Sequence, residues 1–244
     1  MAINSAYRRR IRITTAAGQA RADLEDDPHR YGVIVAHDGQ RALSVRGLTL
    51  RTPWTLCKDA AAMLAKAEGV PLGTEFGEFY QQVDASLQCT HMADLAALAI
   101  AHAGHGTARR QYDVEVTGPA TGERQFAAME VDGAAYLNWT IEGTRIVSPG
   151  RYAGEDLRTM MRAVHAAGDP SHTEAIQVLR RAVFVARSRR LDLDKLRNAA
   201  ETGHVPGACY VFQPGLSEHA LRIRGATRDF THRREQMLID LENH

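Results

Sequence analysis

The chain has 244 residues, 44% of them hydrophobic and 24% charged, which is the composition of a globular protein with one sizeable core or two modest ones. Its 30 Lys and Arg residues nearly balance its 29 Asp and Glu residues, so the charge does not favour nucleic acid as a general partner. No apolar run has the length of a membrane span, and the first residues lack the apolar core of a secretory signal. We therefore predict a cytoplasmic protein without a membrane partner.

The chain begins with a polar stretch. Residues 1–26 are first basic and then acidic, which is typical of an N-terminal arm. Residues 30–51 carry two apolar runs around Asp38 and Gly39, a dipeptide that favours the turn of a β-hairpin. Gly47 interrupts the second run and indicates a β-bulge. The sequence thus predicts an arm followed by a hairpin.

Helical periodicity follows the hairpin. Residues 56–69 place apolar side chains on one face of a helix and end in glycine, a common residue after a helix C-terminus. Residues 74–87 predict a shorter helix or turn. Residues 88–103 predict a strongly apolar helix, because its apolar side chains recur at the spacing of a buried face.

The next segment returns to the period of a β-strand. Residues 109–149 alternate apolar and polar side chains and predict an antiparallel meander. Turns are predicted at Gly118-Pro119 and at Asp132-Gly133, because these dipeptides favour chain reversal.

Helices are predicted again after the meander. Residues 154–168 and 171–190 have helical spacing, and Ser171 with Glu174 forms the pattern of a capping box. Residues 204–230 are punctuated by Gly and Pro and predict an irregular tail with short β runs.

The order of these elements predicts an α+β fold, in which a hairpin with helices packs with an antiparallel meander and C-terminal helices. We expect an arm over residues 1–26 and a hairpin-plus-helices part over 27–106. Residues 107–244 are expected to form one compact unit with that part. Neither G-x-G-x-x-G nor a P-loop occurs in the chain, which removes the common nucleotide-binding hypotheses.

Two of the three cysteines stand where predicted helices begin. Cys57 opens the first helix, and Cys89 with His91 opens the third. Unpaired N–H groups at a helix N-terminus favour a thiolate over a thiol. Thiolate and imidazole are common zinc ligands and also form thiol–imidazole catalytic pairs. An odd number of cysteines argues against a disulfide framework, and Cys209, taken alone, is interpreted as a packed apolar side chain.

Four short segments, spread over most of the chain, contain these cysteines and histidines together with their neighbours. They are Asp27-Pro28-His29, the segment from Arg51 to Cys57, the segment from Cys89 to Ala96, and the segment from Cys209 to Pro214. With these segments the whole chain resembles a bacterial family catalogued as a domain of unknown function, number 2889. The family implies no activity.

Residues 27–103 also resemble the iron–sulfur scaffold fold of the NifU and IscU proteins. The shared order is an aspartate before a hairpin, a cysteine that opens a helix, Gly-x-x-Leu at residues 69–72, and a Cys/His pair that opens an alanine-rich helix. This resemblance implies that Asp27, Cys57, Cys89 and His91 lie near a metal site. Acidic residues stand where the scaffold has its first cysteine, and the His-Cys order is reversed, which favours a mononuclear site over a cluster.

The leading hypothesis is a metal-dependent enzyme of the lyase or hydrolase type that acts on a small aromatic or acyl substrate. Zn²⁺ or Fe²⁺ would be held by Cys57, Cys89, His91 and Asp27. Asp27 or His29 would serve as general base, and Arg51 would clamp a substrate carboxylate. An apolar pocket would be walled by aromatic side chains, namely Trp54, Tyr136, Trp139, Tyr210 and Phe212.

Three alternatives remain open from the sequence. The first is a non-catalytic carrier of a metal or an iron–sulfur cluster. The second is a metal-free enzyme in which Cys89 is the nucleophile and His29 or His91 the base. The third is a structural zinc site in a small-ligand binding module. A homo-oligomer is compatible with all of them.

Overall fold

The computed structural model describes residues 5–118, 123–166 and 168–241, and the chain divides into two compact units. The first unit takes the chain up to Arg10, from Gln111 to Leu191, and from Asp229 onward. The second unit takes Ile11–Arg110 and Asp192–Arg228. The chain therefore crosses between the units several times, and residues 192–228 belong with the part of the chain that contains the predicted hairpin.

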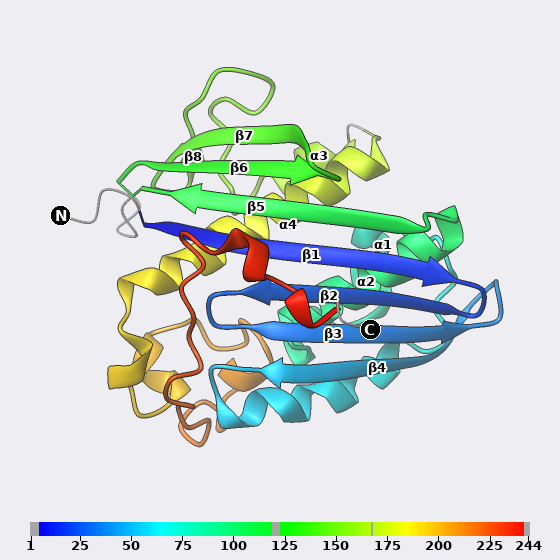
Figure 1. The fold of residues 1–244 in the computed structure, drawn as a ribbon, viewed down its shortest axis with the longest axis horizontal. Coiled ribbons are helices and arrows are strands. Elements are labelled where there is room, and N and C mark those ends of the chain that lie inside the picture. The colour runs from blue at the N-terminus through cyan, green and yellow to red at the C-terminus, as the bar shows by residue number, and fades with distance from the viewer. Residues whose placement is uncertain (1–4, 119–122, 167, 242–244) are drawn as a thin grey trace. The chain divides into compact units, whose positions relative to one another are not determined.

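The second unit is built on antiparallel strands covered by helices (Figure 1). Its strands are the end of β1 (Ala6–Ala16), β2 (Gln19–Asp26), β3 (Arg30–His37) and β4 (Ala42–Arg51). Its helices in this half of the chain are the 3₁₀ helix η1 (Thr55–Ala67), α1 (Phe76–Gln82), η2 (Ala85–Leu87) and α2 (Thr90–His105). Helix α2 packs against β2 and β3, and η1 packs along β4. The predicted hairpin and the predicted apolar helix are confirmed.

The predicted N-terminal arm is wrong for the described residues of 1–26, which contain all of β1 and β2. In β2 the side chains of Ala20, Ala22 and Leu24 alternate into the core and are at most 1% exposed. The charged residues between them, Arg21 and Asp23, concealed this period of two. Asp23 is itself buried and paired with Arg30 at 3.0 Å, so its charge does not indicate solvent exposure.

Gly47 does not form the predicted bulge. The register shifts between β3 and β4 lie elsewhere, at Arg30/Tyr31 and at Ala36/His37. A Cβ atom at Gly47 would lie 2.8 Å from the sulfur of Met92 in α2. Glycine is therefore required here because the helices approach the strand closely, not because the strand is interrupted.

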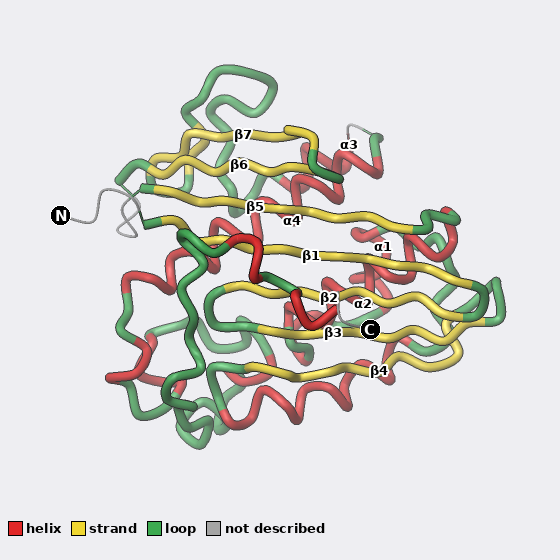
Figure 2. Tube along the Cα trace, viewed as in Figure 1, coloured by secondary structure: helices red, strands yellow, loops and turns green. Residues whose placement is uncertain are grey.

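The returning segment of the second unit is mostly irregular (Figure 2). It contains three short 3₁₀ helices, η4 (Leu193–Lys195), η5 (Ala199–Thr202) and η6 (Tyr210–Phe212). The predicted β runs are reduced to isolated bridges, such as the one that pairs Trp54 with Arg222. The Arg222 guanidinium also donates to the Pro53 carbonyl at 3.0 Å, so this segment is tied to the chain at the end of β4.

The first unit contains the predicted meander, which is confirmed. Its strands are the start of β1, then β5 (Arg109–Thr117), β6 (Gln125–Val131), β7 (Ala134–Glu142) and β8 (Arg145–Ile146). Its helices are α3 (Met161–Ala166), α4 (Pro170–Ala186), η3 (Arg187–Arg190), η7 (Arg234–Gln236) and η8 (Ile239–Leu241). The turn at Asp132 and Gly133 has positive φ at both residues, 52° and 84°. Pro119, predicted in the other turn, lies outside the described residues.

Helix α4 packs against β6 and β7 and does not use the predicted capping box. Its N-cap is Asp169, whose side chain accepts a hydrogen bond from the His172 amide. Glu174 is instead buried, and its carboxylate accepts a hydrogen bond from the Tyr112 hydroxyl of β5. A residue predicted to cap a helix end therefore serves as a buried link between a helix and a strand.

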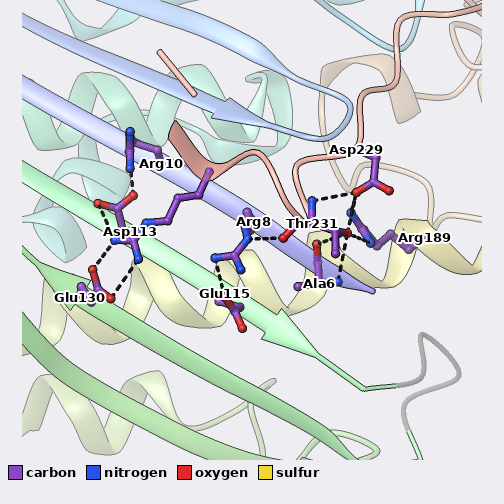
Figure 3. Close-up of polar contacts among 10 residues, drawn as sticks. Ala6, Arg8, Arg10, Asp113, Glu115, Glu130, Arg189, Asp229 and Thr231 are labelled. Atoms are coloured by element: carbon purple, nitrogen blue, oxygen red, sulfur yellow. Dashed lines mark hydrogen bonds and ion pairs between the residues drawn. The ribbon is translucent and has the colours of Figure 1, made fainter. Parts of the chain in front are cut away.

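A network of arginines and carboxylates covers another part of the first unit (Figure 3). Arg10 donates to Asp113 at 2.7 Å, Arg189 pairs with Asp229 at 2.9 Å, and Arg8 donates to the Thr231 carbonyl at 3.1 Å. A cavity of about 340 Å³ in this unit is lined partly by the same charged side chains. Each of these guanidinium groups already has a protein partner.

The fold class is α+β, as predicted, with antiparallel strands and helices in separate runs of the chain. Among the helices of the described ranges, none combines the length and the apolar character that crossing a membrane requires.

Candidate metal centre

Asp26, His29 and His91 form a buried group in the second unit. Each offers one possible ligand atom, and these atoms lie within 4.8 Å of one another. Asp26 ends β2, His29 immediately precedes β3, and His91 lies in the first turn of α2. The Asp26 amide donates to the His29 carbonyl at 2.9 Å, which closes the turn between the two strands. The hairpin turn and the helix N-terminus thus bring these three side chains together.

Asp26 orients the His29 ring. Its Oδ1 atom accepts from the His29 amide at 2.9 Å and lies 2.9 Å from His29 Nδ1. With a proton on Nδ1 this contact is a hydrogen bond, and the ring can then bind an ion only through Nε2. Without that proton, Nδ1 and Oδ1 are close enough to bind one ion together.

Arg51 holds the turn that carries Asp26 and His29. Its guanidinium donates to the Asp26 carbonyl at 2.8 Å, to the His29 carbonyl at 3.0 Å, and to the Asp27 carbonyl. It also donates to the Glu25 carboxylate at 2.9 Å. Arg51 was predicted to clamp a substrate carboxylate, but in the structure its guanidinium binds the protein itself. Its observed contacts are those of a residue that positions the turn.

Asp27, the predicted carboxylate ligand, is buried in this same turn. Its carbonyl accepts hydrogen bonds from Arg51 and from the Arg228 amide, the latter at 2.9 Å. The carboxylate in the group of possible ligands belongs to its neighbour Asp26. The sequence could not distinguish two adjacent aspartates, because the turn geometry decides which one faces the histidines.

Tyr31 extends the group on the same strand. Its ring stacks on His29 with a centroid distance of 5.5 Å and on His91 with a distance of 5.8 Å. The two imidazole rings are 4.0 Å apart. Tyr31 was not among the predicted site residues, although a period of two from His29 places both side chains on one face of the strand. That spacing was the signal that could have identified it.

The predicted thiols Cys57 and Cys89 lie near Tyr31 and contribute to the raised pKa of its hydroxyl. Both cysteines are 7% exposed, and Cys89 is the N-cap of α2, as predicted. The Cys89 side chain makes no capping hydrogen bond to the amides of the first turn. Two cysteines that are distant in the sequence therefore both lie near Tyr31.

Burial dominates the acidity of these groups. It raises the pKa of Cys89 to about 12, with a further contribution from Cys209, and the amides of α2 only partly oppose it. Burial also raises the pKa of the Cys57 thiol and of the Tyr31 hydroxyl far above their usual values, and the neighbouring thiols add to both. The expectation that a helix N-terminus would leave these thiols acidic is wrong, because desolvation is the larger effect.

The aromatic side chains predicted to wall a pocket fall in different units. Trp54, Tyr210 and Phe212 pack around Cys57 in one apolar cluster of the second unit. Tyr136 and Trp139 belong to β7 of the first unit, where Trp139 is buried and Tyr136 packs against His172. We therefore assign only the first three to the surroundings of the candidate centre.

A comparison of the chain with known protein families found no match, and a comparison with curated proteins found none either. The two resemblances noted from the sequence stay predictions, and the chemistry of the site must be argued from its geometry.

Proposed function

We propose that this protein is a metal-dependent enzyme whose Zn²⁺ or Fe²⁺ is held by Asp26, His29 and His91. The observation that supports this most directly is the convergence of three buried ligand atoms within 4.8 Å. Two imidazoles and one carboxylate are a common ligand set for both ions in enzymes. Three protein ligands leave coordination positions open for water or substrate, which is typical of catalytic rather than structural sites.

The reaction we propose is of the hydrolase or lyase type on a small aromatic or acyl substrate. An ion with an open position would polarise a substrate carbonyl or lower the pKa of a bound water. The aromatic rings of Tyr31 beside the imidazoles and of Trp54 beside Cys57 support an apolar substrate. The three free cysteines favour a reducing compartment, so we retain the cytoplasm as the location.

The proposal changes the predicted ligand set. Asp26 takes the place of Asp27, and His29 becomes a ligand in addition to His91. Cys57 and Cys89 are no longer ligands in this proposal and lie near Tyr31, whose pKa they help to raise.

Metal content tests the proposal. Untagged protein purified with added Zn²⁺ or Fe²⁺ should contain about one ion per chain, and the His91→Gln variant should contain less than about a tenth of that. His105→Gln is the matched control, because His105 lies on the same helix and is exposed. Wild-type protein without bound ion, or full metal content in the His91→Gln variant, would overturn the proposal.

One observation favours a second function, a metal-free cysteine enzyme. The contact between Asp26 and His29 Nδ1 would also orient His29 as a general base for a thiol nucleophile such as Cys89. In that case Cys89 should be alkylated by iodoacetamide at least tenfold faster than Cys57, and His29→Gln should abolish the difference. Chelator treatment should leave the reaction unchanged, which separates this function from the metal-dependent one.

A further inference from the structure

The cavity in the first unit lies on the solvent-facing side of strands β5, β6 and β7. Glu115, Ala128 and Asn138 come one from each of these strands and are direct cross-strand partners, so their side chains project from one face. All three line the cavity, whose volume is about 340 Å³. Ala128 stands between the two longer side chains and extends no further than its methyl group. The sheet surface is therefore hollow at this position.

The C-terminal part of the unit forms one wall of the cavity. Arg234 of η7 and Met237 both line it, and Arg234 donates to the Glu130 carboxylate at 3.1 Å. The Met237 carbonyl accepts from the Arg10 guanidinium at 3.2 Å, and the Met237 side chain is 1% exposed. The next residue, Leu238, is fully buried with a φ of 59°, a conformation that a leucine adopts only where its surroundings hold it. This wall is therefore fixed before any ligand arrives.

Arg8 of β1 and Glu115 form the opposite wall (Figure 3). The Arg8 Nε atom donates to the Thr231 carbonyl at 3.1 Å, and its Nη1 atom pairs with Oε2 of Glu115. A guanidinium has five N–H groups and a carboxylate about four lone-pair sites, so these contacts do not exhaust either group. Asn138 adds an exposed amide, which both donates and accepts. Donors and acceptors are thus mixed around the hollow.

The charged side chains that line the cavity balance one another. Among the described residues they are three arginines and three carboxylates, namely Arg8, Arg9, Arg234, Asp113, Glu115 and Glu130. The ion pairs of Arg8 with Glu115 and of Arg234 with Glu130 leave little field to attract a further ion. The ligand that suits this lining is uncharged and carries several groups that each donate and accept. Hydroxyl groups have this property.

From these observations we propose that the cavity binds a small uncharged polyol of the monosaccharide class. Its hydroxyl groups would bond to Arg8, Glu115 and Asn138, and the C–H groups of its ring would contact the methyl group of Ala128. The cavity volume lies within the range of about 300 to 1,000 Å³ that is usual for small-molecule sites. The site belongs to the first unit and does not rest on the proposed function, whose metal ligands belong to the second.

The test is a titration of isotope-labelled, full-length protein with glucose, galactose and mannose, followed by the NMR signals of the backbone amides. At least one sugar should bind with a Kd of about 1–20 mM, because hydrogen bonds that replace those to water each add little affinity. The amides of Ala128 and Asn138 should shift on binding. The amino-sugar and uronic-acid analogues of that sugar carry one charge each and should bind at least about threefold more weakly.

Variants on the cavity floor complete the test. Ala128→Leu should weaken binding at least about tenfold, because its side chain occupies the space that the ring needs. Ala128 is exposed, so this variant is expected to fold, which circular dichroism would check. Ala134→Leu is the matched control, because Ala134 is an exposed strand residue outside the cavity lining, and it should bind as the wild type does. Asn138→Ala should weaken binding about two- to tenfold.

Three results would overturn this site. They are the absence of binding by all three sugars, tighter binding of a charged analogue than of its parent sugar, and wild-type affinity in Ala128→Leu.

Discussion

Two regions of the molecule, one in each unit, gather polar groups in different ways. In the first unit, guanidinium and carboxylate groups with permanent charges meet one another, as Arg10 does with Asp113 and Arg189 with Asp229 (Figure 3). Beside Tyr31 in the second unit, two imidazoles gather with the single buried carboxylate of Asp26. Paired charges need no further partner, whereas two imidazoles and one carboxylate form a set of donors that a cation can join. Changes in the first region should therefore alter stability, and changes in the second should alter binding.

The largest expected effect is on the ligand group. His91→Ala should weaken Zn²⁺ binding by more than about 100-fold, since removal of an outer partner alone costs about 10- to 100-fold. Competition with a chromophoric chelator measures the affinity. The free energy of unfolding of the metal-free protein should change little more than for His105→Ala. Wild-type zinc affinity in His91→Ala would contradict the expectation that changes in the second region alter metal binding.

Arg51→Lys should have the next largest effect. A single ammonium cannot donate to the carbonyls of Asp26, Asp27 and His29 at once, so the turn should loosen and zinc affinity should fall by about 10- to 100-fold. Arg41→Lys is the control, because Arg41 is an exposed arginine of the same unit that donates to the Gly69 carbonyl. Equal affinities in the two variants would mean that Arg51 only stabilises the fold.

Tyr112→Phe tests the same comparison in the first unit. It removes the hydroxyl that donates to the buried Glu174 carboxylate in the first unit. The free energy of unfolding should fall by about 1–3 kcal/mol, as expected when a buried polar group loses its partner. Urea unfolding measures the loss, with Tyr136→Phe as the exposed control. Zinc affinity should stay within twofold of wild type, and a larger change would contradict the separation of roles.

The smallest effect is expected at Asp229. Partial burial alone would raise the pKa of this carboxyl, but hydrogen bonds from Thr231 and Arg189 outweigh it and lower the pKa to about 2. A lowered pKa means that the carboxylate stabilises the fold above its ordinary pKa and loses this effect as the pH falls towards 2. Asp229→Asn should thus cost less than about 1 kcal/mol at neutral pH, because the Asp229 side chain is largely exposed.

Urea unfolding at several pH values measures this difference. It should be constant from pH 7 to about pH 5 and shrink between about pH 4 and pH 2. A difference that grows on acidification would show that the lowered pKa does not belong to the folded state.

Local patterns predicted the local elements of this fold. The hairpin around Asp38, the apolar helix after Cys89 and the meander from residue 109 all follow from periodicity and turn residues. β2 was missed because charged side chains occupy its alternate positions, and one of them, Asp23, is buried in an ion pair. A charged residue indicates an exposed position only when no oppositely charged partner lies nearby. The partner of Asp23 is Arg30, on the next strand.

The site shows the same limit. The cysteines and His91 could be selected from their places at helix entries, yet their surroundings depend on contacts between distant segments. Cys209 reaches the other thiols through a hydrogen bond between Tyr210 and Gln88, more than a hundred residues away in the chain. No local sequence pattern indicates a contact between segments so far apart. Tyr31, by contrast, could have been identified from the sequence, because it lies two residues after His29 and therefore on the same face of the strand.

The return of the chain to the second unit has a consequence for biosynthesis. Residues 11–110 leave the ribosome first, but Cys209 and the segment that bonds to Arg51 at Ala226 emerge only after the strands of the first unit have been made. A nascent chain released before residue 226 would carry Asp26, His29 and His91 without the hydrogen bond from Arg51 to the Ala226 carbonyl. The turn that holds Asp26 and His29 therefore gains its full set of contacts only at the final stage of synthesis. Neither unit can be cut out as one uninterrupted piece of the gene.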